Sequence, residues 1–155
     1  MPLVRYDEWC NMTKIERSAI VPFSAEKMFK LVDDIPAYPD FLPWCKSTTV
    51  YSRNEGEVKA SIEISKAGIN KSFTTCNINR NYSIIELNLV EGPFKSLKGQ
   101  WRFEALQANA SKVSLEIEFE FSNKLLSMTV GPVFSQICNT LVNSFVGRAQ
   151  EVYER

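Results

Sequence analysis

Apolar and polar residues alternate along the middle of this chain with the period of a half-buried β-strand. The clearest run extends from Val113 to Phe121, where Val, Leu, Ile or Phe occupies every second position. Weaker runs cover residues 14–21, 58–64, 71–79, 85–89 and 101–105. Short turns rich in Gly, Asn or Pro separate the later runs. We therefore expect five or six consecutive antiparallel strands with one face exposed to water.

Helical periodicity lies on both sides of this alternating region. Ser24 is a favourable N-cap for a helix over residues 25–33. Three prolines limit residues 35–42 to a short helix or tight turns. After Asn123, apolar residues recur every three or four positions as far as Val152. This spacing predicts a long helix, which Gly131–Pro132 should kink or split.

The order of these elements predicts an α+β fold. One strand and two short helices precede the meander, and the long helix follows it. The apolar stripe of the helix and the apolar face of the sheet must be buried against each other. The compact solution is a curved antiparallel sheet wrapped around the long C-terminal helix. Such a sheet and helix seldom fill the space between them, so the architecture favours an internal cavity.

The composition is that of an ordinary globular protein that lacks the residue most used in catalysis. The 155 residues include 18 basic and 18 acidic side chains, so we expect no general attraction to DNA. The chain has no histidine and no phosphate-binding or nucleophile motif. We therefore predict no enzymatic activity, no metal and no catalytic cofactor. Four widely separated cysteines fit reduced thiols in a cytoplasmic protein.

The first eleven residues carry charges and precede a second methionine, Met12. We predict that residues 1–11 are an N-terminal extension, or that Met12 rather than Met1 is the true start. Residues 12–155 should then form a single domain, whose length is ordinary for one hydrophobic core.

Two segments place aromatic rings beside proline or glycine turns. They are Tyr38-Pro-Asp-Phe-Leu-Pro-Trp-Cys45 and Glu91-Gly-Pro-Phe-Lys-Ser-Leu-Lys-Gly-Gln-Trp-Arg-Phe103. Together with residues 65–75, 119–125 and 148–153, they resemble the bacterial ribosome association toxin (RatA) family. They also resemble its mitochondrial relatives, the coenzyme-Q-binding START-like proteins. Both groups belong to the helix-grip (START-like, Bet v 1-like, SRPBCC) superfamily of polyketide cyclases and lipid transporters, and the resemblance runs from about Met12 to Arg155.

This resemblance implies two activities. One is the binding of ubiquinone or a related isoprenoid lipid in an internal cavity, with a respiration-linked role as a chaperone or carrier. The other is binding of the large (50S) ribosomal subunit, which blocks its association with the small subunit. An aromatic polyketide cyclase or dehydratase is the alternative within the same superfamily, and it would act through a Tyr, Arg or Glu in the cavity.

The apolar residues expected to face inward are candidate cavity-lining residues, although each of them could equally belong to an ordinary core. They are Ile62, Phe73, Leu87, Phe94, Trp101, Leu115, Phe119, Phe134, Ile137 and Leu141. The two aromatic segments supply candidate gate residues, with a rigid plug as the alternative. These are Phe41, Leu42, Trp44, Gly92 and Pro93. The first three would touch the ligand tail or make a transient membrane contact.

Lysines on two predicted hairpin tips are candidate ribosome contacts, because hairpin lysines can bind RNA phosphates. We include Ile69, which we expect to be exposed at one tip. The set is Lys66, Ile69, Lys71, Lys95 and Lys98. The alternative is an ordinary solvated loop whose charges serve solubility.

Overall fold

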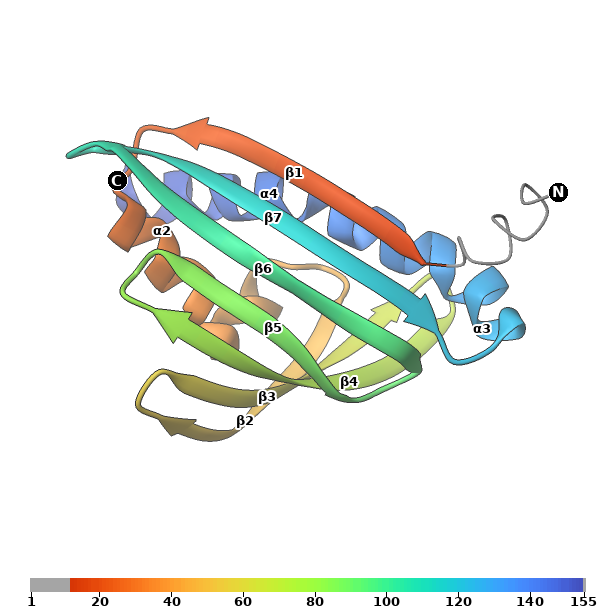
Figure 1. Cartoon of the computed structure of the whole chain (residues 1–155). Coiled ribbons are helices and arrows are strands. Elements are labelled where there is room, and N and C mark those ends of the chain that lie inside the picture. The colour runs from red at the N-terminus through yellow and green to blue at the C-terminus, as the bar shows by residue number, and fades with distance from the viewer. Residues whose placement is uncertain (1–11, 155) are drawn as a thin grey trace, which may run out of the picture.

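Seven antiparallel strands form one curved sheet in the computed structural model, which describes residues 12–154. Across the sheet the order is β1-β7-β6-β5-β4-β3-β2, so that β1 and β2 are the edges. The strands are β1 (Thr13–Val21), β2 (Cys45–Asn54), β3 (Glu57–Lys66), β4 (Ile69–Arg80), β5 (Ile84–Glu91), β6 (Phe94–Gln107) and β7 (Ala110–Phe121). The sheet curves around one long helix (Figure 1). The predicted helix-grip architecture is confirmed.

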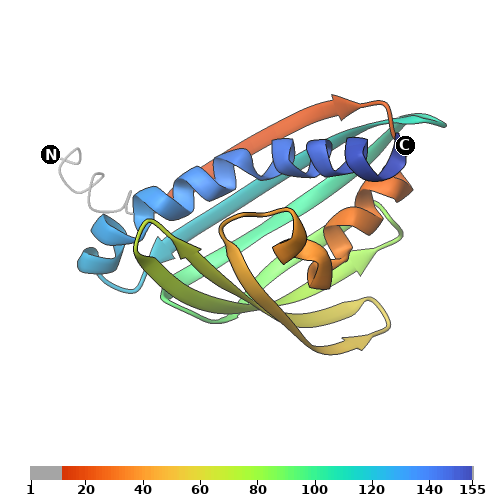
Figure 2. The ribbon, with the colours of Figure 1, turned by 180° about the vertical axis from the view of Figure 1, so that it is seen from behind.

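Two short helices follow β1. Helix α2 (Ala25–Asp33) begins at Ser24, whose hydroxyl accepts a hydrogen bond from the Lys27 backbone N–H at 3.2 Å. This is the predicted N-cap. The 3-10 helix η1 (Ile35–Asp40) contains Pro36 and Pro39 and ends before Phe41. Both helices lie beside the long C-terminal helix, on the concave side of the sheet (Figure 2).

The C-terminal helical region is divided at Gly131–Pro132, as the sequence indicates. Helix α3 (Lys124–Thr129) is short, and Asn123 caps it by accepting from the Leu126 N–H at 2.8 Å. Helix α4 (Gly131–Tyr153) carries Pro132 in its first turn, where the missing N–H costs no hydrogen bond. Proline is tolerated in the first turn of a helix but not in its interior, so a new helix begins at Gly131–Pro132.

Helix α4 supplies one side of the core. Its buried residues are Phe134, Ile137, Cys138, Val142, Phe145 and Ala149. The predicted stripe extends one turn too far, because Val152 is 39% exposed. In that last turn of α4, Tyr153 packs on the core instead, with its ring 5.8 Å from the ring of Phe23. Within residues 12–154, no helix is long and apolar enough to span a membrane.

Two strands are longer than the alternation predicts. Strand β6 begins at Phe94 rather than near Trp101, and β2 spans ten residues for which the sequence shows no clear alternation. The pairing of β6 with β7 shifts register between Phe94 and Ser96, and β2 has two such shifts. Each shift changes which residues face inward, so a strict two-residue period is lost there. The expected extension, residues 1–11, lies outside the described residues.

Candidate functional site

An apolar cavity lies between the concave face of the sheet and α4. Strands β3 to β7, helix η1 and α4 all contribute to its walls. Its free volume is about 80 Å³, which is below the roughly 300–1,000 Å³ typical of ligand pockets. Apolar side chains surround this space, but its volume is small. A ligand of drug size or larger therefore has to displace some of these side chains.

Seven of the ten predicted lining residues border this cavity: Ile62, Phe73, Leu87, Trp101, Phe134, Ile137 and Leu141. The alternation of the strands and the three- and four-residue spacing of α4 bring them together from distant parts of the sequence. The residues that the sequence reasoning missed are Ile35, Tyr38, Trp44, Ala60, Ile64, Thr75, Asn77, Leu97, Ile117, Cys138 and Phe145. Four of them, Ala60, Ile64, Thr75 and Ile117, lie two positions from a predicted lining residue on the same strand.

Phe94, Leu115 and Phe119 do not line the cavity, which corrects the prediction. Phe94 stacks on Phe121, with ring centroids 4.8 Å apart, and Phe119 meets Phe134 edge-on at 4.8 Å. These rings form a packed cluster beyond one end of the free space. Leu115 is fully buried on β7, the strand beside β1, and α4 packs directly on both of these strands. These three residues therefore serve as core.

The proline-rich segment at residues 38–45 forms a fixed part of the wall. The Tyr38 hydroxyl donates to the Val32 carbonyl oxygen, and the Ser65 N–H donates to the Trp44 carbonyl oxygen at 2.8 Å. Leu42 and Trp44 are buried. They are thus not placed to touch a membrane, contrary to the expectation, because backbone and side-chain contacts turn them inward. The segment fits the plug alternative, and gating by it stays a prediction.

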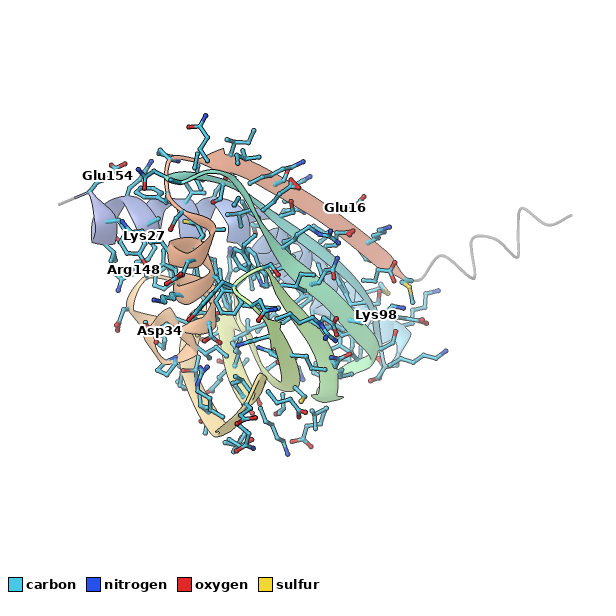
Figure 3. The ribbon with its side chains drawn as sticks, turned by 60° about the vertical axis from the view of Figure 1, so that its left-hand side comes forward. Glu16, Lys27, Asp34, Lys98, Arg148 and Glu154 are labelled. Atoms are coloured by element: carbon cyan, nitrogen blue, oxygen red, sulfur yellow. The ribbon has the colours of Figure 1, made fainter. Side chains whose placement is uncertain are left out.

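Phe41 is half-buried at the same end. Its ring lies 5.2 Å from the ring of Phe145 and 5.0 Å below the Arg148 guanidinium. Arg148, at the outer surface of α4 (Figure 3), therefore covers an aromatic ring by a cation–π contact.

The turn at Gly92–Pro93 lies directly against a cavity residue. A Cβ added to Gly92 would lie 2.7 Å from the Cβ of Phe73, and Gly92 has φ +155°. Only glycine fits this close approach. Movement of the turn would uncover Phe73, so its position is compatible with a gate, which likewise stays a prediction.

The cavity contains no charged side chain among the residues that line it. Its two titratable members are Tyr38 and Cys138, and burial raises the pKa of both groups. Each therefore stays neutral near pH 7 and is a poor base or nucleophile. Over residues 12–154, no group of three or more His, Cys, Asp or Glu side chains is placed to hold a metal ion.

A polar pair interrupts the apolar lining. Thr75 and Asn77 face inward from β4, each 8% exposed, and the Thr75 hydroxyl donates to the Asn77 Oδ1 at 2.8 Å. The sequence could have indicated them, because Thr75 and Asn77 lie two and four positions after Phe73, and such residues share one face of a strand.

The predicted basic residues do not form one patch. Lys66 and Lys71 flank the β3–β4 tip, and Ile69 beside them is half-buried and packs on the core rather than being exposed. Lys95 pairs with Glu120 at 3.8 Å. Lys98 lies within β6 on the outer face of the sheet (Figure 3), not at a tip, and it borders the same shallow depression as Glu86, Glu116 and Glu118. Acidic neighbours therefore reduce the positive potential near Lys95 and Lys98.

Residues 21–146 match the model of the family described as polyketide cyclase / dehydrase and lipid transport. The chain belongs to this family. Among family members, the ribosome association toxin RatA of Vibrio cholerae is 46% identical over 142 residues, covering 92% of this chain and 99% of the relative. RatA of Escherichia coli K12 is 44% identical, with 92% and 90% covered.

More distant relatives and similar solved structures carry other names. A Xenopus laevis protein named coenzyme Q-binding protein COQ10 homolog B, mitochondrial, is 26% identical, with 89% of this chain and 58% of the relative covered. The solution structure of the Caulobacter crescentus protein CC1736 is 27% identical, with a TM-score of 0.72 and 92% and 99% covered. A Streptomyces aromatase/cyclase has a TM-score of 0.80 at 17% identity, with 90% and 94% covered, and it shows the fold alone.

Proposed function

We propose that this chain binds a hydrophobic ligand, ubiquinone or a related isoprenoid lipid, in the cavity between the sheet and α4. The observation that carries this proposal is the uncharged, aromatic and aliphatic lining of that cavity. Burial of about ten isoprenoid methylene equivalents supplies about 8 kcal/mol, at about 0.8 kcal/mol for each CH₂. The name of the Xenopus relative, a coenzyme Q-binding protein, also supports the proposal.

The ligand enlarges the narrow cavity by moving side chains that are not fully enclosed. Ile62, Phe73, Leu87 and Leu141 line it and are only half-buried. Ile62, Phe73 and Leu87 lie on β3, β4 and β5, and Leu141 lies on α4, which packs more closely on β1 than on these three strands. An isoprenoid tail therefore separates α4 from β3 and β4 rather than from β1.

The chain carries its ligand without transforming it. A cyclase or dehydratase needs a group that takes or gives a proton near neutral pH. The lining offers the Tyr38 hydroxyl, which is already donating to Val32, and the buried Cys138 thiol. Turnover of an aromatic polyketide substrate by the purified chain would establish the alternative cyclase function instead.

The first test is mass spectrometry of an organic extract of the chain purified from a ubiquinone-producing bacterium. We expect a near-stoichiometric isoprenoid quinone. Ala60→Leu adds bulk inside the cavity, since Ala60 is buried in its wall, and should abolish retention of the quinone. Ala105→Leu makes the same change at an exposed position of β6 and should retain the quinone. An empty wild-type extract that stays empty after quinone is added in detergent would contradict the proposal.

Binding to the large ribosomal subunit is the second candidate function, favoured by relatives that are 44–46% identical and named ribosome association toxins. Lys66 and Lys71 at the β3–β4 tip are the better candidate contacts, because Lys95 is paired with Glu120. We expect Lys66→Glu with Lys71→Glu to weaken co-sedimentation with 50S subunits at low salt. Lys59→Glu with Lys112→Glu changes the charge equally at the opposite end of the sheet and should leave it intact. Equal behaviour of the two variants would exclude this tip as the contact.

A further inference from the structure

Asn77 carries an unused hydrogen-bond donor inside the cavity. Its Oδ1 accepts from Thr75, and among residues 12–154 its Nδ2 donates no hydrogen bond. The residue is 8% exposed and lines the cavity. The Nδ2 is not among the fully enclosed unpaired side-chain atoms of the described residues, so it borders the free space of the cavity rather than packed atoms. Nearly all buried polar side chains in proteins are paired. The unpaired N–H of Asn77 is therefore available to donate a hydrogen bond to an acceptor in the cavity.

The next inward amide on the same strand shows what a structural role looks like. Asn79 Nδ2 donates to the Asp33 Oδ1 at 2.9 Å and so ties β4 to the end of α2, although the Asn79 Oδ1 is itself buried without a partner. The Asn77 amide makes no such hydrogen bond to another element, although it is the same type of side chain two positions earlier on β4. Thr75 instead holds the Asn77 carbonyl oxygen, which fixes the rotamer of the amide.

We propose that Thr75 and Asn77 form the polar recognition point of the cavity, where the Asn77 amide donates a hydrogen bond to a neutral carbonyl oxygen of an otherwise apolar ligand. The acceptor is neutral because none of the residues lining the cavity is charged, and an unpaired carboxylate is too costly to bury. Quinones have this chemistry: an aromatic-sized apolar ring with carbonyl oxygens at its edge. This inference rests on the proposed function and assigns its head group to a place on β4.

The infrared carbonyl band of a bound quinone tests this directly. The probe is decyl-1,4-benzoquinone, whose C=O stretch falls in frequency when the oxygen accepts a hydrogen bond. In wild type we expect one shifted and one unshifted carbonyl band. Asn77→Leu should restore the unshifted band and weaken quinone binding roughly tenfold, as expected for the loss of one hydrogen bond. Thr75→Val, which frees the amide to turn, should give a smaller loss.

Decylbenzene, which has no oxygen, is the matched probe. Its affinity, measured by calorimetry, should stay the same or rise in Asn77→Leu. Asn79→Leu is the matched control variant, and it should lower stability while leaving the carbonyl shift in place. If wild-type protein binds the quinone with unshifted carbonyl bands, the inference is overturned and the proposed function survives. If neither probe binds wild type, both are overturned.

Discussion

Gly99 of β6 pairs with Ile117 of β7. A Cβ placed on it would lie 2.4 Å from the Glu116 carbonyl oxygen and 2.9 Å from the Ile117 Cα. Backbone atoms cannot yield as a flexible side chain does. We therefore expect Gly99→Ala to lower the free energy of unfolding by about 1–3 kcal/mol, measured by urea unfolding and circular dichroism.

Gly147 is the matched control for this prediction. It lies inside α4, and an added Cβ has no atom within 4 Å. Gly147→Ala should raise the free energy of unfolding by roughly 0.5–1 kcal/mol, because alanine restricts the unfolded chain and suits a helix interior. If the two substitutions had the same sign, the steric argument at Gly99 would be wrong.

At the scale of the elements, Asp33 fastens α2 to two strands. Its carboxylate accepts from Arg53 of β2 at 2.9 Å and from Asn79 of β4 at 2.9 Å. The Arg53 pair is exposed and contributes little, whereas the Asn79 hydrogen bond is partly buried. Asp33→Ala should therefore cost about 1–2 kcal/mol of unfolding free energy and speed hydrogen exchange in α2.

Lys30→Ala is the control on the same helix. Its ion pair with Glu26 is fully exposed to solvent, so we expect little change in stability or exchange. Equal effects of the two substitutions would mean that the helix depends on surface charge rather than on the Asp33 contacts.

At the scale of the whole molecule, the absence of histidine shapes the response to pH. Folding raises the pKa of Cys45 to about 11, mainly by burial, and burial also raises the pKa of Cys138 and Tyr38. Above about pH 9 the unfolded chain loses these protons first, so it binds fewer protons than the folded chain. The free energy of unfolding should therefore be nearly constant from pH 6 to 8 and should fall from pH 9 towards 11.

Urea unfolding at pH 7, 8, 9.5 and 10.5 checks this pH dependence. Cys45→Ala with Cys138→Ala should reduce the fall, since two of the three buried groups are gone. A fall of the same size in the double variant would assign the effect to other groups.

The sequence predicts those parts of the molecule that depend on local chemistry. The helix at residues 25–33, its Ser24 cap and the break at Pro132 follow from hydrogen-bond needs of a few neighbouring residues. The sequence does not predict the start of β6 at Phe94, because this start depends on a register shift that arises only when β6 pairs with β7.

The candidate site divides in the same way. Periodicity brings most of the lining residues to one face, but it cannot tell a ring that borders free space, such as Phe134, from one packed among other rings, such as Phe119. Nor can it reveal that Lys95 meets Glu120, since that ion pair depends on how β6 and β7 are aligned. In the sequence, Asn77 is only a polar residue in a weakly predicted strand. Its position in the cavity wall is visible only in the folded structure.

The two register shifts in β2 have a consequence for how molecules of this chain meet one another. An edge strand with straight, unpaired amides invites a neighbouring copy to continue the sheet. In β2 the shifts fall between Cys45 and Ser47 and between Val50 and Ser52, and Lys46 and Arg53 add charge along the same edge. Such interruptions bend the row of free N–H and C=O groups away from the line that a partner strand needs. The β2 edge is therefore a poor template for the addition of a strand from another molecule.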